Sequence, residues 1–140
     1  MYLNFTTTTG EKMIENNATE KERRVILIAD DDEVMGYIMS SLLEKAGHQV
    51  TLVTDGKKAI EVLGARADIE LVITDLQMPG ALGTEVLMML KDTSHKAEAW
   101  LTSGGISKDT IQDAKDLGAT QTFDKRKVVS FFKEQGLIPS

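Results

Sequence analysis

The chain has 140 residues, and its 22 acidic and 16 basic side chains give a formal net charge of −6. This length indicates one domain, and the excess of acid argues against nucleic-acid binding, which needs a basic face. The absence of cysteine excludes disulfides, thiolate catalysis and cysteine-based metal sites. No apolar run approaches the ~20 residues of a membrane span, and the N-terminus lacks a signal-peptide pattern. We therefore expect a cytoplasmic protein.

The first 22 residues are polar and show no sustained apolar period. We expect a flexible extension over residues 1–22. Five short apolar runs follow, each leading into a segment of helical character. The predicted strands are Val25–Ala29, Val50–Val53, Ile69–Ile73, Ala97–Leu101 and Thr122–Phe123.

The segments between these runs carry apolar residues at the spacing of an amphipathic helix. Their apolar stripes begin at Val34, Ala59, Val86, Ile111 and Val128. Strands that alternate with helices predict βαβ units and a parallel sheet. Right-handed crossovers then place helices on both faces of the sheet. The sequence therefore predicts a doubly wound (βα)5 three-layer α/β sandwich.

Carboxylates follow two of the predicted strands at the point where each strand ends. Asp75 closes one apolar run, and Asp30 begins an acidic run that extends to Glu33. In an open parallel sheet these carboxyl ends form the ligand-binding edge. Each pair of like charges at ~4 Å costs roughly 4 kcal/mol at an effective dielectric of about 20, so we expect a hard cation such as Mg²⁺ there. The alternative is that the acidic run only caps the next helix, for which one aspartate would suffice.

The turn after Asp75 gives this residue a second possible role. Met78, Pro79 and Gly80 predict a tight turn that holds Asp75 outward and leaves the Gln77 carbonyl facing the same spot. An aspartate carboxylate can act as a nucleophile toward phosphorus. The plainer interpretation is that Asp75 merely ends the strand.

Two further segments could contact a phosphoryl group. Ser103 offers a hydroxyl, and Gly104 lets the backbone present N–H donors. Lys125 offers an ammonium after the last predicted strand. Taken singly, these residues are equally consistent with an ordinary turn and a surface lysine.

Other chemically versatile residues receive no functional role. His48 and His95 stand at loop-like positions without a partner pattern, and we expect both to be exposed to solvent. Trp100 is expected in the core of the sheet. The methionines fall mostly at helical spacing and are expected in the core or on an exposed docking face.

Taken together, these residues resemble the receiver domain of bacterial response regulators, over about residues 24–135. The segment Asp75–Gly80 is close to the family's phosphoacceptor motif, and Gly118-Ala119 matches the pair that precedes the family's lysine. The resemblance implies a five-stranded sheet of order 2-1-3-4-5, as in flavodoxin-like folds. It assigns the acidic pair, the phosphoacceptor, the hydroxyl and the lysine to Asp30 and Asp31, Asp75, Ser103 and Lys125 respectively.

The function implied by this resemblance is two-component phosphorelay signalling. Asp75 would accept a phosphoryl group from a phosphohistidine on a sensor histidine kinase or a histidine phosphotransfer protein, and a downstream protein target would read the result. The protein would be no enzyme beyond its own phosphorylation and dephosphorylation. The resemblance implies Mg²⁺ or Mn²⁺ held by Asp30, Asp31, Asp75 and the Gln77 carbonyl, and phosphoryl contacts from Ser103, Gly104 and Lys125.

The resemblance also sets expected boundaries and a docking face. The receiver domain would cover residues 23–136 and leave a short tail at 137–140, with no output domain. The phosphodonor would dock at the start of the first helix, beside the acidic residues. The expected docking residues are Met35, Gly36 and Met39, which lie on or beside that face. Some of them must also serve the core, and the sequence does not say which.

Two departures from the family pattern affect the expected switch surface, Thr122 and Phe123. Arg126 follows the lysine where the family usually has proline, and Thr122 stands where an aromatic ring is common. We expect a trans Lys125–Arg126 bond, because a cis bond before a non-proline residue costs about 2.5–4 kcal/mol. Phe123 should point to the face opposite Thr122, so the output surface should respond weakly or differently to phosphorylation.

Two alternative functions remain open. Asp30 and Asp32 also resemble the Asp-x-Asp motif of haloacid-dehalogenase-like phosphatases, with Asp30 as the nucleophile. That family needs a further acidic pair after its lysine, whereas only Glu134 follows here, and it leaves Asp75 without a role. The other alternative is a degenerate receiver that binds partners without being phosphorylated.

Overall fold

The computed structural model describes residues 23–105 and 107–140. The expected extension over residues 1–22 lies outside the described residues. Within the described part, the strands are β1 (Val25–Ala29), β2 (Gln49–Val53), β3 (Leu71–Asp75), β4 (Glu98–Ser103) and β5 (Gln121–Asp124). The helices are α1 (Glu33–Lys45), α2 (Gly56–Ala65), α3 (Gly83–Asp92), α4 (Lys108–Asp116) and α5 (Val128–Glu134), with a 3₁₀ turn, η1 (Lys125–Lys127), before α5.

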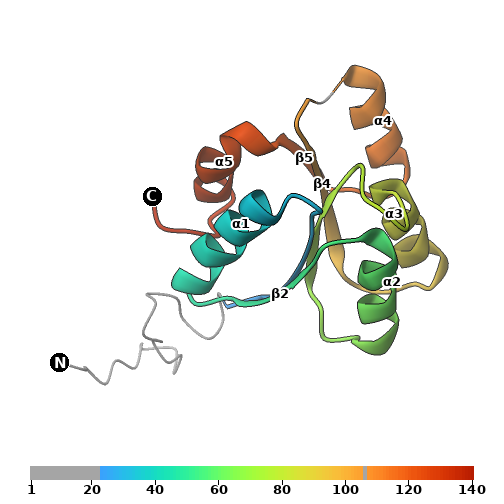
Figure 1. The fold of residues 1–140 in the computed structure, drawn as a ribbon, viewed down its shortest axis with the longest axis horizontal. Coiled ribbons are helices and arrows are strands. Elements are labelled where there is room, and N and C mark those ends of the chain that lie inside the picture. The colour runs from blue at the N-terminus through green and yellow to red at the C-terminus, as the bar shows by residue number, and fades with distance from the viewer. Residues whose placement is uncertain (1–22, 106) are drawn as a thin grey trace.

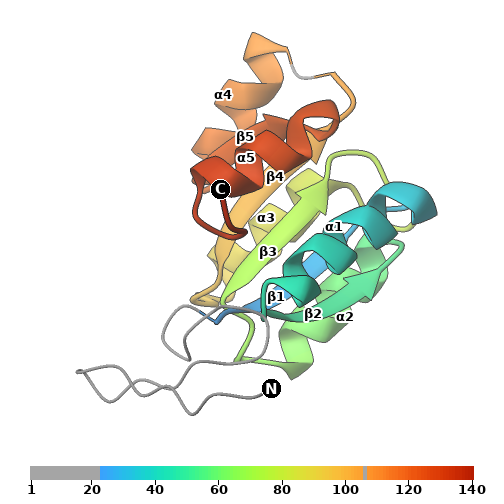
Figure 2. The same ribbon diagram turned by 90° about the vertical axis from the view of Figure 1, so that its left-hand side faces the viewer.

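All five strands run parallel in one sheet of order β2-β1-β3-β4-β5. The helices α1 and α5 cover one face, and α2, α3 and α4 cover the other (Figure 1). Seen from the side, α1 and α5 lie in front of the sheet (Figure 2). The predicted doubly wound fold and its strand order are therefore confirmed.

The strand ends differ from those predicted by apolar runs. Strands β3 and β4 continue past the last aliphatic residue to Asp75 and Ser103. Backbone pairing in a sheet tolerates a polar side chain when that side chain has a hydrogen-bond partner. The Thr102 hydroxyl, for example, donates to the carbonyl of Phe123 at 3.0 Å. Asp75 pairs with Thr102 in register, so the nucleophile candidate is part of the strand.

The core consists of two clusters, one on each face of the sheet. The cluster under α2, α3 and α4 includes Leu27, Val72 and Leu101, and the cluster under α1 and α5 includes Ile28 and Trp100. Trp100 is buried, as predicted. Alternation along each strand supplies both clusters because a parallel sheet is covered on both faces.

The predicted exposure of the histidines is wrong for His48, which is buried. Its Nδ1 accepts the backbone N–H of Arg24 at 3.0 Å, and its Nε2 lies 2.8 Å from the carbonyl of Leu137. His95 is half-buried and bridges the Arg66 carbonyl and the Ala97 N–H. Sequence could not reveal these partners, because His48 and Leu137 are 89 positions apart.

The packed unit extends past residue 136. Leu137 and Ile138 are buried in the same cluster as Trp100, although the sequence analysis assigns them to a tail. Across the described residues, no helix is both long and apolar enough to cross a membrane.

Candidate functional site

Three carboxylates meet at the carboxyl edge of the sheet. Asp30 follows β1, Asp75 ends the neighbouring strand β3, and Asp31 lies in the loop after β1. Each offers an oxygen, and these oxygens lie within 4.8 Å of one another. Asp30 and Asp75 are buried, whereas Asp31 is exposed. The adjacency of β1 and β3 thus brings together acids that are far apart in the sequence.

Asp32, the third acid of the run, has a different task. It is the N-cap of α1, and its Oδ1 accepts the N–H groups of Val34 at 3.0 Å and Met35 at 3.1 Å. The capping alternative raised by the sequence is therefore true of Asp32. It leaves Asp30 and Asp31 to the acidic cluster.

Lys125 enters this cluster from the end of β5. Its Nζ lies 2.8 Å from Asp75 Oδ2 and 3.1 Å from Asp30 Oδ1. Burial by itself would lower the pKa of Lys125, but the hydrogen bonds to Asp75 and Asp30 outweigh it and raise that pKa. The ammonium therefore stays charged between the two carboxylates.

Asp75 is held in an environment that disfavours its charge. Burial raises the pKa of the Asp75 carboxyl above its ordinary value, and the negative charge of Asp30 acts in the same direction. The hydrogen bond from Lys125 opposes both effects. Asp75 Oδ1 also accepts the N–H of Leu76 at 2.8 Å.

One buried oxygen in the cluster lacks a hydrogen-bond partner among the described residues. Asp30 Oδ1 accepts from Lys125 and from the Asp32 N–H at 2.9 Å, but the buried Asp30 Oδ2 has no hydrogen-bond partner. A buried, unpaired carboxylate oxygen is costly. It fits a divalent cation, because hard cations take carboxylate oxygens as ligands.

Two glycines fix the turn that follows Asp75. A Cβ on Gly83 would lie 2.2 Å from the Asp75 carbonyl oxygen, and the Gly83 N–H donates to the Leu76 carbonyl at 2.8 Å. A Cβ on Gly56 would lie 2.1 Å from the Ala81 carbonyl oxygen. Sequence reasoning missed both residues. Their only signal was a glycine at the first position of a helix.

The acidic cluster borders a cavity of about 430 Å³. At the edge of this cavity, Ser103 Oγ donates to the Gly105 carbonyl at 3.0 Å and accepts the Gly105 N–H at 3.3 Å. The lining comprises Asp31, Asp75, Leu76, Gln77, Ser103, Gly104, Gly105 and Lys125. Most of the residues assigned to the site by the sequence therefore share one cavity.

The predicted docking residues require a correction. Met39 has no exposed surface and belongs to the core, and Gly36 is buried against Leu52. Both lie on the inward face of α1, because the helical period turns them toward the sheet. Met35 is half-buried. The outward apolar face of α1 consists instead of Val34 and Tyr37, each 70% exposed, and Ile38, 39% exposed.

The residues of the predicted switch surface point to opposite faces. Phe123 is buried and stacks on Phe131 with ring centroids 4.3 Å apart. Thr122 pairs in register with Leu101, a member of the opposite core cluster. The Lys125–Arg126 bond is trans, as predicted.

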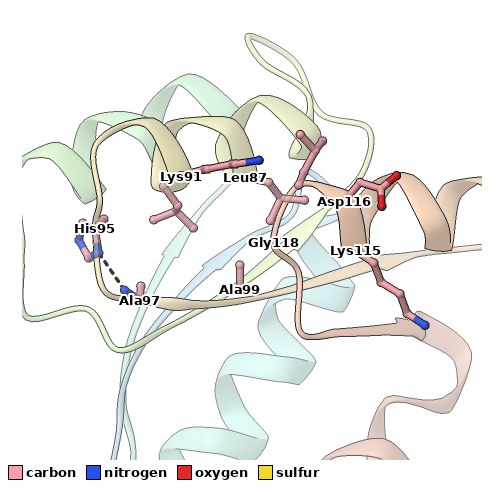
Figure 3. Close-up of a pocket in the computed structure, with 10 residues that line it drawn as sticks. Leu87, Lys91, His95, Ala97, Ala99, Lys115, Asp116 and Gly118 are labelled. Carbon is pink, nitrogen blue, oxygen red and sulfur yellow. Dashed lines mark hydrogen bonds between the residues drawn. The ribbon is translucent and has the colours of Figure 1, made fainter.

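A second cavity, of about 290 Å³, lies between α3 and α4 (Figure 3). Ala97 and Ala99 of the β4 region line it, and Lys91 and Asp116 stand on opposite sides of it. It shares no lining residue with the acidic cavity. None of the residues that the sequence assigns to the site lines this second cavity.

A family model for the response regulator receiver domain matches residues 26–130, which is well over half of the chain. The chain belongs to the response regulator receiver domain family. The family is a signalling family of two-component systems rather than a class of metabolic enzymes. The resemblance to receiver domains that the motif residues indicated is thereby confirmed.

Related sequences match part of this receiver domain. The rice two-component response regulator ORR5 (Oryza sativa subsp. japonica) is 36% identical over 52% of this chain and 54% of its own length. The Bacillus subtilis transcriptional regulatory protein YrkP, described as uncharacterized, is 33% identical over 62% of this chain and 37% of its own length. The chain thus spans about half or less of these relatives.

Solved receiver structures share the fold. The Vibrio cholerae chemotaxis response regulator CheY4 has a TM-score of 0.71 at 21% identity, covering 83% of this chain and 99% of its own. The receiver domain of Ssk1, in complex with the histidine phosphotransfer protein Ypd1 of Saccharomyces cerevisiae, has a TM-score of 0.73 at 18% identity, covering 80% of this chain and 86% of that chain. At these identities the likeness concerns the fold alone.

Proposed function

We propose that this receiver accepts a phosphoryl group on Asp75 from a phosphohistidine of a sensor kinase or a histidine phosphotransfer protein. The observation that carries the proposal is the contact of Lys125 Nζ with Asp75 Oδ2 at 2.8 Å, at the rim of a cavity that also exposes Asp31. A carboxylate nucleophile, a fixed cation and an acidic cluster are the parts that phosphoryl transfer to aspartate requires.

The residues at the site suit a divalent cation, Mg²⁺ or Mn²⁺. Asp30 Oδ2, a carboxylate oxygen of Asp31 and one of Asp75 would hold it, together with the carbonyl of Gln77. When bound, the ion supplies positive charge that reduces the repulsion between these carboxylates and the incoming phosphoryl oxygens. This assignment extends the three-acid cluster, in which the buried Asp30 Oδ2 has no hydrogen-bond partner among the described residues.

The protein's own groups then position the reaction. An Asp75 oxygen forms the bond to phosphorus while the bond from phosphorus to the donor imidazole breaks, and the imidazole keeps the electron pair. Lys125 turns from Asp30 to a phosphoryl oxygen, and the Gly104 N–H meets another. Ser103 must exchange its contact with the Gly105 carbonyl for one with the phosphoryl group, which draws this loop inward.

The donor should dock on the exposed apolar face of α1. Val34, Tyr37 and Ile38 form this face, and they follow the N-cap Asp32 directly along the helix. The yeast Ssk1 receiver was solved with a histidine phosphotransfer protein, which supports a partner of the same kind here. Tyr37→Asp should slow transfer from the phosphodonor protein far more than labelling by acetyl phosphate. Equal slowing in both assays would remove the docking assignment.

Phosphorylation adds roughly −1.5 to −2 charges at the carboxyl edge. The added charge would shift the Ser103 loop and Lys125 from one arrangement to another, and a downstream protein would distinguish the two. Phe123 is stacked on Phe131 and cannot replace a mobile ring at Thr122. We therefore propose that the output surface responds without an aromatic flip. Cytoplasmic location stays a prediction from the sequence.

The decisive experiment is labelling with acetyl phosphate and Mg²⁺, followed by intact-mass spectrometry and peptide mapping. Asp75→Asn should abolish labelling while the circular dichroism spectrum stays unchanged. If Asp30→Asn abolished labelling and Asp75→Asn did not, the phosphatase alternative would replace the proposal. If the native protein took no label from acetyl phosphate or from any phosphohistidine donor, the degenerate-receiver alternative would apply.

A further inference from the structure

The turn that carries Lys125 is closed by the side chain of the preceding residue. Asp124 ends β5 and is the N-cap of η1, and its Oδ1 accepts the N–H of Arg126 at 2.9 Å. An aspartate that bonds a backbone N–H two residues on imposes a local turn without further support. Lys125 is the residue that this turn encloses, so the Asp124 carboxylate determines where the lysine side chain leaves the backbone.

Arg126 holds that carboxylate in place. Its Nε lies 3.0 Å from Oδ1 and 3.1 Å from Oδ2 of Asp124, and its Nη2 lies 2.5 Å from Oδ2. The Asp124 side chain is 19% exposed, whereas the Arg126 side chain is 75% exposed. The hydrogen bonds from the Arg126 side chain, followed by its backbone N–H, lower the pKa of Asp124 to about 2. The carboxylate is therefore ionised whenever Asp75 is.

Lys125 needs such support more than the aspartates do. Asp30 directly follows the buried strand β1, and Asp75 is the last residue of the buried strand β3. Lys125 instead reaches them along a flexible four-carbon stem from a short turn. Ordering a lysine side chain costs up to about 1.5–2 kcal/mol of conformational entropy. A fixed backbone reduces the number of arrangements that miss the site, and this matters most when Lys125 moves onto a phosphoryl oxygen.

We propose that Asp124 and Arg126 act as a positioning pair for Lys125. Asp124 sets the turn, and Arg126 holds the rotamer of Asp124. The pair touches neither Asp75 nor the phosphoryl group, and its effect passes through the lysine. The inference rests on the proposed phosphoacceptor function.

The chain contains a matched control for this pair. Arg66 and Asp68 have the same spacing and a similar side-on geometry, with Nε 3.1 Å from Oδ1 and Nη2 3.0 Å from Oδ2. They lie near the opposite edge of the sheet, in the connection between α2 and β3. Asp68→Ala therefore removes an equivalent surface ion pair without changing the turn of Lys125.

The experiment measures the beryllofluoride affinity of the Mg²⁺-loaded protein, together with the ¹H–¹⁵N signal of the Lys125 ammonium. Asp124→Ala should weaken beryllofluoride about tenfold, the effect of losing roughly one hydrogen bond, and should broaden the Lys125 signal. Arg126→Ala should weaken it about threefold. Asp124→Asn keeps an acceptor oxygen and should stay within about twofold of the native protein, as should Asp68→Ala.

Several results would overturn the inference. One is native affinity and a native Lys125 signal in Asp124→Ala. Another is a loss in Asp124→Asn as large as that in Asp124→Ala, which would make charge, and not the turn, the cause. If Asp124→Ala proved unstable, native behaviour of Arg126→Ala would decide against the pair. Failure of the proposed function through the degenerate-receiver alternative gives a different result, because the native protein would then not bind beryllofluoride. The Lys125 signal of the unliganded protein would still test the pair.

Discussion

The polar side chains at the two edges of the sheet differ in how fully they are hydrogen-bonded. The amino edge is where the parallel strands begin, and the carboxyl edge is where they end. At the amino edge, Glu98 accepts hydrogen bonds from Arg24, Trp100 and Thr120. These bonds lower the pKa of Glu98 although burial alone would raise it. At the carboxyl edge, the buried Asp30 Oδ2 has no partner among the described residues, and the pKa of Asp75 is raised above its ordinary value by burial.

How fully the polar side chains are paired distinguishes the structural edge from the candidate functional edge more clearly than residue type does. Both edges contain buried or half-buried charged and titratable side chains. At the amino edge, His48 and His95 each bond backbone groups through both ring nitrogens. At the carboxyl edge the acids repel one another, and among the described residues Lys125 is the cation that contacts them. An incompletely paired charged cluster is where an external ligand can contribute binding energy.

The largest expected effect is on the lysine that bridges the acids. Lys125→Met should lower beryllofluoride affinity by about 100-fold, since hydrogen bonds to charged groups contribute about 1.5–3 kcal/mol and each 1.4 kcal/mol is tenfold. Mg²⁺ affinity, measured by isothermal titration, should be equal or higher, because a competing cation has left Asp30 and Asp75. Glu98→Gln, the amino-edge control, should leave both affinities within about twofold. A comparable loss in both variants would contradict the division between the edges.

The next effect concerns the glycine beneath Asp75. Gly83→Ala should destabilise the protein by about 1–3 kcal/mol, the usual range for forcing atoms into a packed site. It should also weaken beryllofluoride, because the added Cβ would displace the Asp75 carbonyl, 2.2 Å away. Urea unfolding followed by Trp100, the only tryptophan of the chain, measures the stability.

The control for this substitution lies in the helix α2. A Cβ on Gly64 meets nothing within 4 Å. Gly64→Ala should therefore be neutral or stabilising by up to about 1 kcal/mol, since alanine favours the helix. Equal losses in the two variants would show that close packing at Gly83 is not the cause.

A smaller, purely structural effect is expected at the amino edge. His48→Ala removes a part-buried hydrogen bond to the Arg24 N–H and a buried hydrogen bond to the Leu137 carbonyl. We expect a loss of about 2 kcal/mol in the free energy of unfolding, measured by urea denaturation, and unchanged beryllofluoride affinity. A reduced beryllofluoride affinity in a fully folded His48→Ala protein would mean that the two edges of the sheet are coupled.

The smallest effect is a dependence on pH. The folded protein holds the proton of Asp75 more tightly than the unfolded chain does, so this group disfavours folding increasingly as pH rises from its ordinary pKa of 3.8 through its raised value. Mg²⁺ binding needs the carboxylate and should therefore weaken as pH falls through that same raised value. Mg²⁺ titrations at a series of pH values from about 8 to about 3 measure this dependence. A midpoint at or below 3.8 would contradict the raised pKa.

Several site residues were predictable from sequence because strand ends are local features. Asp30 and Asp75 each follow a buried apolar run, and the order of strands places such ends side by side. The division of labour within the acidic run was not predictable. Asp32 caps α1 while Asp30 turns inward, and this depends on backbone direction after β1 and not on residue type.

The inward and outward faces of α1 show the same limit. The periodic pattern predicts that some of Met35, Gly36 and Met39 serve the core, but the helix is apolar on much of its surface. Contact with Leu52 decides that Gly36 is buried, and exposure decides that Tyr37 is outward. A helix with excess apolar residues has no unique inward face until it packs on its sheet.

The sequence by itself determined the βα alternation, the strand order through family resemblance, and the acids, hydroxyl and lysine assigned to the site. These depend on short-range periodicity and on residues at strand ends. Only the tertiary structure decided which polar groups are paired. Glu98 finds the distant donors Arg24 and Thr120, and His48 finds Leu137. Lys125 reaches across the sheet to Asp30. The reason is that a hydrogen bond forms between atoms brought together by packing, at separations along the chain that no local pattern encodes.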